Sequence, residues 1–359
     1  MKKILNIVLS SSFIFILWGC PNGFNKNKHT RAFFPETAVN LDIINSEFDD
    51  YNSVLPETHF GKRLVFSSNR QTSGESFNII GDNFHATWYW DNGHLVVDNS
   101  GFWENTDFIS SLLAAVDKNG NQFGPYIISR DTIVGDTSKR LSFFTFSTNA
   151  GGTLYHQEYF YNLHDDHNTA GENSEHFTIK FLGDTPEQRY VSFFGAQILT
   201  IDSWSVETKL VTDIYFDETN GAAHDIFSIH KPDSLDFDGF LRSDGDYLRI
   251  KQDILSSSSD DRCPFVNGNF IVFTSNRDGG YGGYDLYYSY YIDGSWQAPA
   301  NFGPGINSEY DEFRPVPVQV WNYENDMMVF SSNRPGGMGG FDLYYVGINK
   351  INTLVQIEE

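Results

Sequence analysis

A short Asn-Arg pair occurs three times in the sequence and is the pattern with the clearest capacity for chemistry. The three copies are Asn69-Arg70, Asn276-Arg277 and Asn333-Arg334. A ring of guanidinium groups could bind a carboxylate or an acidic peptide. Alternatively, asparagine supports a turn, and arginine forms an ion pair with a carboxylate of its own unit, such as Asp285 or Asp342. Because the pair recurs in each unit, we interpret it as structural and leave a binding role open.

Clusters of histidine and aspartate offer weaker candidates for metal binding. Four histidines share one region with two aspartates, a combination that could bind zinc: His156, His164, Asp165, Asp166, His167 and His176. Their spacing matches no helical zinc signature, so we interpret them as part of an exposed loop. Residues 117–121 contain part of a calcium-loop pattern without its terminal glutamate, and the acidic stretches 233–238 and 259–261 read as solvated loops. We predict no metal site and no cofactor, with calcium kept as an alternative.

Sequence signals of hydrolytic enzymes are sparse. The sequence contains no Gly-x-Ser-x-Gly motif for a serine nucleophile. Acidic residues are plentiful, but spacing alone singles out no pair as the two carboxylates of glycoside hydrolysis. Three tryptophans could stack on sugar rings or pack within a hairpin: Trp88, Trp90 and Trp103, interleaved with Asp91, Asn92 and Glu104. We predict no catalytic residue and therefore no enzyme.

The elements that position these residues are predicted by an internal repeat. The segment 270–288 and the segment 328–345 have nearly the same sequence, about 57 residues apart, and residues 64–70 match their first part. Each copy has an apolar run rich in β-branched and aromatic residues, a Gly-rich stretch and an Asp-Leu-Tyr return. This order predicts a strand, a tight connection and a second strand. Such a unit needs neighbours on both faces.

A second repeat connects the two ends of the chain. Residues 40–51 resemble residues 301–313, and each segment precedes one of the apolar runs. We predict that residues 37–41 supply the outer strand of the last unit and close a ring, which removes exposed sheet edges. An open array with two similar linkers is the alternative. The middle of the chain repeats only weakly, at residues 141–152, 190–194 and 213–227. The expected fold is all-β, a closed β-propeller of about six four-stranded blades.

The Phe-(Ser/Thr)-Ser-Asn-Arg, Gly-Gly and Asp-Leu-Tyr elements together resemble the WD40-like repeats of TolB-type β-propellers. The match is strong at residues 270–288 and 328–345, fair at 64–70 and poor elsewhere. The resemblance implies a propeller in the envelope of a Gram-negative bacterium, more firmly than it implies any particular activity. The sequence differs from such proteins in showing no N-terminal α/β domain and no peptidoglycan-binding domain.

The first residues are typical of a bacterial lipoprotein signal. Lys2 and Lys3 precede the apolar run 4–17, and Leu17-Trp18-Gly19-Cys20 resembles a cleavage site that leaves a lipidated Cys20. We predict a signal peptide at 1–19, a lipidated cysteine and flexible tether at 20–36, and the propeller at 37–359. The other cysteine, Cys263, has no disulfide partner and is expected to be a small buried side chain.

Charge and compartment complete the prediction. The formal net charge of −23 excludes nucleic acid as a ligand, because phosphate backbones would be repelled. The membrane would be reached through the lipid anchor. We predict an envelope location, with the periplasmic face of the outer membrane favoured over the cell surface. The predicted function is a non-enzymatic scaffold for an envelope protein partner. The alternative is a propeller that binds or cleaves glycans.

Overall fold

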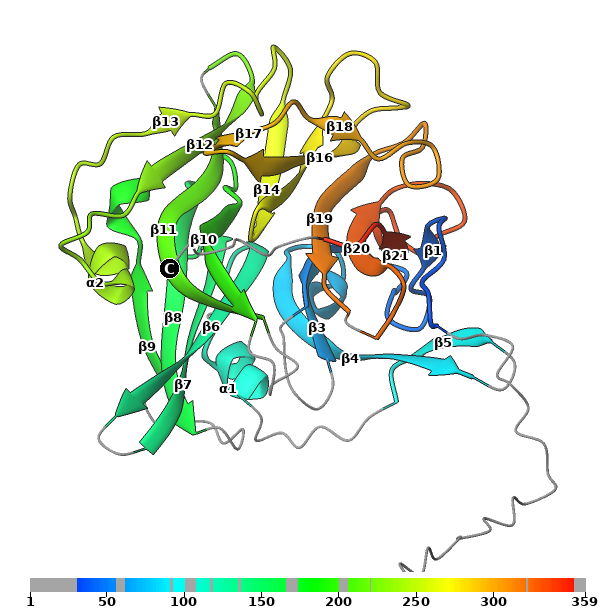
Figure 1. The fold of residues 1–359 in the computed structure, drawn as a ribbon, viewed down its shortest axis with the longest axis horizontal. Helices are drawn as coiled ribbons and strands as arrows, with labels where there is room; N and C mark the ends of the chain where they lie inside the picture. Colours follow the sequence, from blue (N-terminus) through cyan, green and yellow to red (C-terminus); the bar gives the residue numbers. More distant parts are fainter. Residues whose placement is uncertain are drawn as a thin grey trace, which may run out of the picture.

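The computed structural model describes residues 31–55, 62–90, 93–100, 108–116, 119–134, 137–165, 174–199, 206–219, 221–320 and 322–351. These residues form five antiparallel sheets arranged around a common axis, which is a β-propeller (Figure 1). The signal peptide and Cys20 lie outside the described residues. Within the described part of the chain, no helix is long and apolar enough to span a bilayer.

Each blade consists of four strands in the order inner to outer. Blade 1 is β2 (Asp50–Val54), β3 (Lys62–Ser68), β4 (Asn78–Tyr89) and β5 (His94–Asp98). Blade 2 is β6 (Gln122–Val134), β7 (Thr137–Thr148), β8 (His156–Asp165) and β9 (Ser174–Thr178). Blade 3 is β10 (Val191–Leu199), β11 (Val206–Thr219), β12 (His224–His230) and β13 (Ile250–Lys251).

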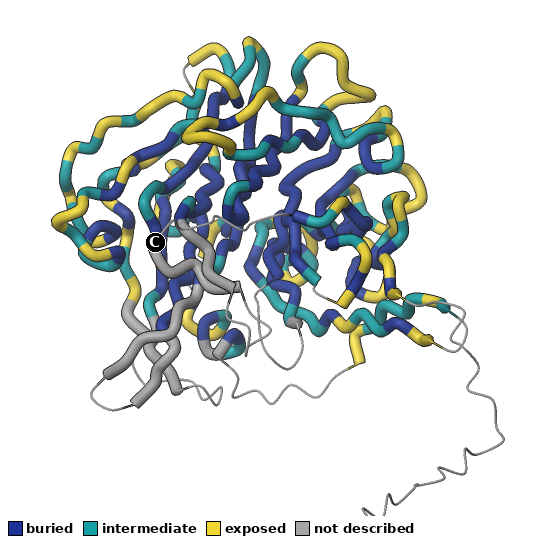
Figure 2. Tube along the Cα trace, viewed as in Figure 1, coloured by how far each residue is buried: buried dark blue, intermediate teal, exposed yellow. Residues whose placement is uncertain are grey.

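The last two blades contain the strong repeats. Blade 4 is β14 (Asp261–Asn267), β15 (Phe270–Ser275) and β16 (Asp285–Ile292), with β17 (Ser295–Trp296) and β18 (Ala300–Asn301) at its outer edge. Blade 5 is β19 (Glu312–Val318), β20 (Asp326–Ser332), β21 (Asp342–Ile348) and β1 (Val39–Asn40). Every residue of β15 and β20 is buried, as their unbroken apolar runs predict (Figure 2). Short helices occupy the connections: η1 (Arg70–Thr72), α1 (Phe108–Ala115), η2 (Lys180–Leu182) and α2 (Phe237–Arg242).

The two ends of the described chain close the ring, which confirms that prediction. β1 pairs with β21 in the register Val39 to Tyr345. The Asn45 side chain then bonds both backbone groups of Leu343: its Nδ2 donates to the carbonyl at 2.9 Å, and its Oδ1 accepts from the N–H at 2.9 Å. Asn307 bonds Leu286 in the same way in blade 4. The similarity of the two segments in sequence therefore reflects one structural role.

The number of blades is five, so the prediction of about six is wrong. Two stretches that looked like separate units, 190–194 and 213–221, belong to paired strands of one blade, since Val191 lies opposite Phe216. The middle blades also use longer strands, with 13 residues in β6 and 14 in β11, against 6 in β15. A blade count based on the C-terminal spacing therefore overestimates the number.

A β-bulge recurs near the start of the inner strand in four blades. The register shifts between Tyr51 and Val54, and the equivalent shift occurs in β6, β14 and β19. The residue after the first axial side chain has a positive φ of 51–60° in each case: Asn52, Gly124, Cys263 and Arg314. Bulges bend a strand and re-aim its side chains. Only one of the four is glycine, so the sequence gave little warning of this conformation.

Replacing Asn45 by alanine tests the closure. The variant leaves the N–H and C=O of Leu343 without these partners at a buried site, so the free energy of unfolding should fall by about 2–3 kcal/mol. Urea unfolding at neutral pH measures the change. The exposed Asn322, changed to alanine, is the matched control and should lose less than about 0.5 kcal/mol. Equal losses in the two variants would contradict the closure role.

Candidate functional site

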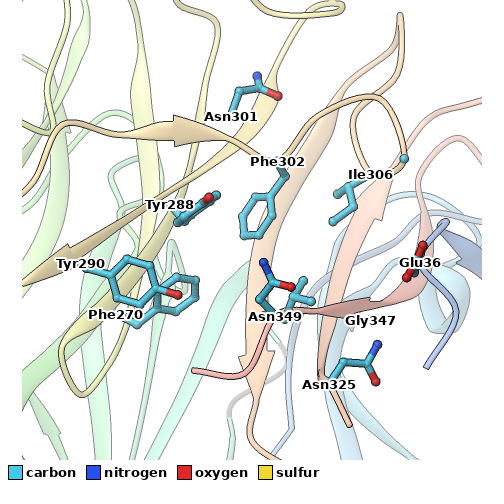
Figure 3. A pocket seen from close by; sticks show the side chains of 12 residues that line it. Glu36, Phe270, Tyr288, Tyr290, Asn301, Phe302, Ile306, Asn325, Gly347 and Asn349 are labelled. Atoms are coloured by element: carbon cyan, nitrogen blue, oxygen red, sulfur yellow. The ribbon is translucent and has the colours of Figure 1, made fainter. Parts of the chain in front are cut away.

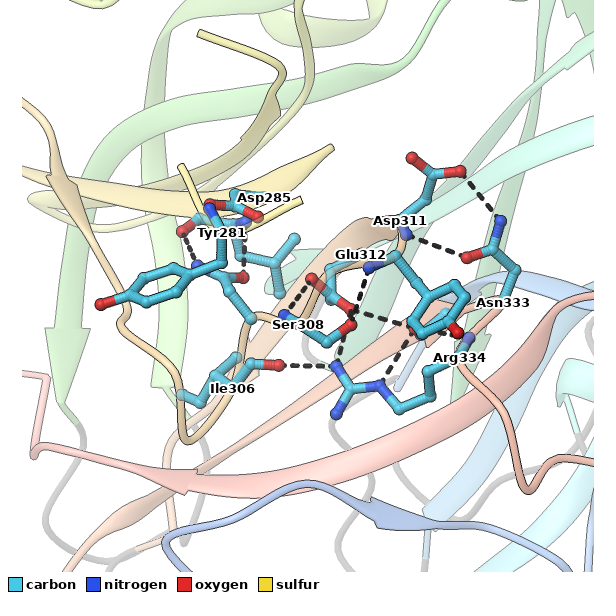
Figure 4. Close-up of polar contacts among 12 residues, drawn as sticks. Tyr281, Asp285, Ile306, Ser308, Asp311, Glu312, Asn333 and Arg334 are labelled. Carbon is cyan, nitrogen blue, oxygen red and sulfur yellow. Dashed lines mark hydrogen bonds and ion pairs between the residues drawn. The ribbon is translucent and has the colours of Figure 1, made fainter. Parts of the chain in front are cut away.

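The Asn-Arg pairs form a repeated latch within the blades. Arg70 pairs with Asp50 at 2.6 Å, and the two later arginines do the same with Asp261 at 2.5 Å and Glu312 at 2.8 Å. Figure 4 shows the last copy, in which Arg334 also donates to the Ile306 carbonyl at 2.6 Å. Each of these carboxylates is buried at the start of an inner strand. The guanidinium supplies the opposite charge that a buried carboxylate requires.

The asparagines and the two predicted aspartates hold neighbouring turns. Asn69, Asn276 and Asn333 each accept a hydrogen bond from the backbone N–H of an aspartate at 2.8–3.0 Å: Asp49, Asp260 and Asp311 respectively. Asp285 and Asp342 are not the partners of the arginines, contrary to the suggested pairing. Asp285 instead accepts from the Tyr281 N–H at 2.7 Å and Asp342 from the Met338 N–H at 2.5 Å, so both fasten the Gly-rich turns.

Aromatic rings from all five blades meet around the axis, at the end where the first and third strands begin. We call this set the axial aromatic cluster: Tyr51, Phe77, Phe123, Tyr155, Tyr190, Tyr284, Phe313 and Phe341. Tyr51 is central, with its ring 5.5 Å from that of Phe313 and 5.0 Å from that of Phe341. Tyr51, Tyr155 and Tyr284 are only half-buried, so part of the cluster faces solvent. Such surfaces suit the apolar faces of planar or ring-shaped ligands.

The cluster is interrupted at blade 3, where charged groups gather. The residue before the third strand is aromatic in four blades, but it is Ala223 in blade 3. The next residue, His224, lies between two carboxylates, with Nε2 3.2 Å from Glu187 and Nδ1 3.4 Å from Asp260. We call Glu187, His224 and Asp260 the acid-histidine group. The Tyr284 hydroxyl donates to Asp260 at 2.8 Å and so connects the group to the axial aromatic cluster.

Asp260 is prepared to remain ionised. Burial alone would raise its pKa, but hydrogen bonds from the His224 backbone N–H and the Tyr284 hydroxyl outweigh burial and lower the pKa below its usual value. Burial and the adjacent carboxylate raise the pKa of Tyr284, which therefore stays a hydrogen-bond donor. Arg262 lies 3.6 Å from Glu187 and 3.2 Å from the buried Asp217, and places a fixed positive charge beside the group.

A second concave site lies between blades 4 and 5, and Figure 3 shows its lining. We call it the lateral groove; its volume is about 300 Å³. Aromatic side chains dominate one end, and amides and a carboxylate occupy the other (Figure 3). Its lining comprises Glu36, Phe270, Tyr288, Tyr290, Asn301, Phe302, Gly305, Ile306, Asn325, Gly347, Ile348 and Asn349.

The remaining candidates from the sequence do not converge on a site. His156 and His176 both bond Glu158, at 3.0 and 2.7 Å, and these bonds lower its pKa against the effect of burial. Among the described residues, no three His, Cys, Asp or Glu side chains are grouped to hold a metal ion. Trp88 packs on Phe33. Cys263 is fully buried, and burial raises the pKa of its thiol. His167, Trp103, Asp91, Asn92, Glu104, Asp166 and residues 117–118 lie outside the described part.

Sequence reasoning missed two members of the acid-histidine group, and Asp260 was considered only as part of an acidic loop. One signal was available. The residue before each latch carboxylate is an aspartate in three copies, Asp49, Asp260 and Asp311, which marks Asp260 as a fixed position at the axial end. Glu187 and His224 belong to irregular segments of the weakly repeating middle, and no spacing connects them.

Comparison with solved structures finds proteins of similar architecture. They include a GH43 protein from Bacillus licheniformis (11% identity, 88% of this chain and 55% of that chain, TM-score 0.42). A glycosyl hydrolase from Bacteroides ovatus matches at 10% identity over 90% and 96% of the two chains, with a TM-score of 0.43. An α-L-arabinanase from Cellvibrio cellulosa, complexed with arabinohexaose, matches at 12% identity over 85% and 93%, with a TM-score of 0.41. This chain thus spans about half the length of the first. No family model and no curated protein matches the sequence.

These comparisons correct two predictions. The non-enzymatic protein-binding scaffold, and with it the statement that the protein is not an enzyme, is contradicted, because the similar structures with a named activity are glycoside hydrolases. The β-propeller is confirmed. The finer assignments to TolB-type repeats and to lipoproteins stay predictions. Identities of 12% or less concern the fold alone, so any chemistry must be argued from the residues of this chain.

The lowered pKa of Asp260 predicts a specific pH dependence of stability. A carboxylate whose pKa is depressed by folding stabilises the protein above its unfolded pKa of about 3.9, and this stabilisation disappears as the pH falls through the folded value. The difference in free energy of unfolding between the wild type and Asp260→Asn should therefore be constant from pH 6 to 8 and shrink below about pH 4. Urea titrations over this range measure it. A difference that grows toward low pH would be the opposite sign and would refute the assignment.

Proposed function

We propose that the protein is a glycan-processing propeller that binds a carbohydrate chain at the axial aromatic cluster and hydrolyses a glycosidic bond with Glu187 and Asp260. The observation that supports this most directly is the acid-histidine group, which places two carboxylates on opposite nitrogens of one imidazole beside half-buried aromatic rings. Aromatic faces and paired carboxylates are the two requirements of glycoside hydrolysis.

The environments of the two carboxylates suggest their roles. Asp260, with its lowered pKa, is the base that accepts a proton from water as the water attacks the anomeric carbon. Glu187, about half exposed, is the acid that donates a proton to the departing glycosidic oxygen as the bond to the anomeric carbon breaks. The imidazole separates the carboxylates. That arrangement agrees with the wider spacing of about 6.5–9.5 Å used by inverting enzymes, which must accommodate a water molecule.

Glu187→Gln and Asp260→Asn test the proposal. Either variant should reduce hydrolysis by about 10²- to 10⁴-fold, since each removes one partner of acid–base catalysis. The measurement is release of reducing ends from arabinan, xylan, β-galactan and β-glucan. Glu187 is exposed, so its glutamine variant should fold like the wild type, which a urea titration verifies.

The matched control is Asp213→Asn, because Asp213 forms a histidine pair of the same kind with His230 at 3.2 Å, outside the axial aromatic cluster. Its activity should equal that of the wild type. Absence of hydrolysis on all four polymers, or equal activity in the three variants, would overturn the assignment of Glu187 and Asp260.

We further propose that the protein is a lipoprotein held at the cell envelope through Cys20, with the outer membrane as the favoured site. Support comes from the basic start, the apolar run 4–17 and the Leu17-Trp18-Gly19-Cys20 sequence. An anchor would keep a glycan-processing domain near cell-surface or periplasmic carbohydrate. The resemblance of the C-terminal repeats to TolB-type propellers agrees with this compartment.

Metabolic labelling with an alkyne fatty acid in a Gram-negative host tests the anchor. The wild type should incorporate the label and sediment with membranes, whereas Cys20→Ser should remain unlabelled and precursor-sized. Cys263→Ala is the control, since the only other cysteine is fully buried and should leave labelling unchanged. Labelling of the Cys20→Ser protein would refute the lipid site.

A further inference from the structure

The lateral groove is a preformed cavity separate from the axial aromatic cluster. Its tyrosines, Tyr288 and Tyr290, lie on β16, which begins at the axial end directly after Tyr284. Tyr290 is six residues beyond Tyr284, a distance of about 20 Å along an extended strand. A small ligand cannot reach both places at once. The groove therefore needs an occupant of its own.

Ring closure builds one wall of the lateral groove. Asn325 bonds the backbone of Phe34 through both ends of its amide, at 2.8 and 2.9 Å, and the Gly347 N–H donates to the Pro35 carbonyl at 2.7 Å. A Cβ at Gly347 would lie 2.1 Å from the Asn325 Nδ2 and 2.7 Å from the Phe34 carbonyl, so only glycine permits this close approach. The wall that ends at Glu36 is thus fixed before any ligand arrives.

The opposite wall is equally fixed. The Tyr288 ring lies 4.7 Å from that of Phe302 and 6.0 Å from that of Tyr290, and the Tyr290 ring lies 4.9 Å from that of Phe270. Asn301, at the edge, is held by Asp285 and Asn307 at 2.8 Å each. Preorganised walls reduce the ordering cost of binding.

The exposed chemistry of the lateral groove is aromatic and neutral. Tyr288 and Tyr290 are half-buried, and within the described residues their hydroxyls have no hydrogen-bond partner, nor does the exposed amide of Asn349. The lining contains no lysine or arginine that would select an anion. Ring faces beside free hydroxyl and amide groups complement a sugar, which presents an apolar C–H face and a rim of hydroxyls.

We propose that the lateral groove is a second carbohydrate-binding site, which takes one or two neutral sugar units of a glycan chain. A cationic ligand is the competing occupant, because aromatic rings with a carboxylate can cage an ammonium group. In Figure 3, however, Glu36 and Tyr290 lie at opposite ends, with Asn349 and Phe302 between them. Their charges and ring faces do not converge on one point, whereas an extended sugar contacts both ends. This inference rests on the proposed function only in the choice of ligand class.

Affinity electrophoresis of the full chain through gels containing arabinan, xylan, β-galactan or β-glucan tests the site. The wild type should be retarded by at least one polymer. Tyr290→Ala and Asn349→Ala should each raise the dissociation constant for that polymer about tenfold, equivalent to ~1.4 kcal/mol. Tyr89→Ala is the matched control, because Tyr89 is an exposed tyrosine of blade 1 outside the groove, and its retardation should be unchanged.

The outcomes separate this proposal from the proposed function. Glu187→Gln should abolish hydrolysis yet keep the retardation, whereas Tyr290→Ala should lose retardation and retain hydrolysis of short oligosaccharides. Retardation without any hydrolysis would support the groove and count against the axial assignment. The groove proposal is overturned if no polymer retards the wild type, if Tyr290→Ala and Asn349→Ala behave like Tyr89→Ala, or if the groove variants lose binding to a tetramethylammonium probe instead.

Discussion

The pairing of β1 with β21 is the constraint on which the rest of the molecule depends. A propeller blade buries both faces, so each blade needs a neighbour on either side, and only a closed ring provides one for the first and last blades. Here two short strand residues and the Asn45 amide achieve closure. The same contact brings Tyr51 of blade 1 against Phe313 and Phe341 of blade 5, and fixes the wall of the lateral groove through Asn325 and Gly347.

Within that ring, departures from the repeat explain where charged groups collect. Three blades begin their inner strand with a buried carboxylate held by an arginine latch. Blade 2 has Gln122 there, which donates to backbone carbonyls, and blade 3 has Arg189, which donates to the Leu182 carbonyl at 3.0 Å. Blade 3 also lacks the aromatic residue before its third strand. The space beside Tyr190 and Arg262 is therefore occupied by His224 and its two carboxylates, and the symmetry of the fold is broken where chemistry is possible.

Sequence periodicity predicts the features that repeat, and these include the blade strands, the Gly-rich turns and the closing segment at residues 37–41. It fails for features that arise from contacts between blades. Arg277 pairs with Asp261, 16 residues before it, whereas the repeat pattern pointed to Asp285. Glu187 and Asp260 come from different blades and meet only because both contact His224. The positive φ of Arg314 reflects a bulge imposed by the ring, because no local turn residue specifies it.

The net charge of the protein adds a constraint on any ligand of the two candidate sites. A formal charge of −23 generates a field that repels acidic polymers on approach, so neutral glycans reach the surface without this penalty. The strand β16 connects the two sites, since Tyr284 stands just before it and Tyr288 and Tyr290 lie along it. A polymer long enough to occupy the lateral groove would be tethered close to the acid-histidine group. Tethering raises its effective concentration there without any new contact at the reacting bond.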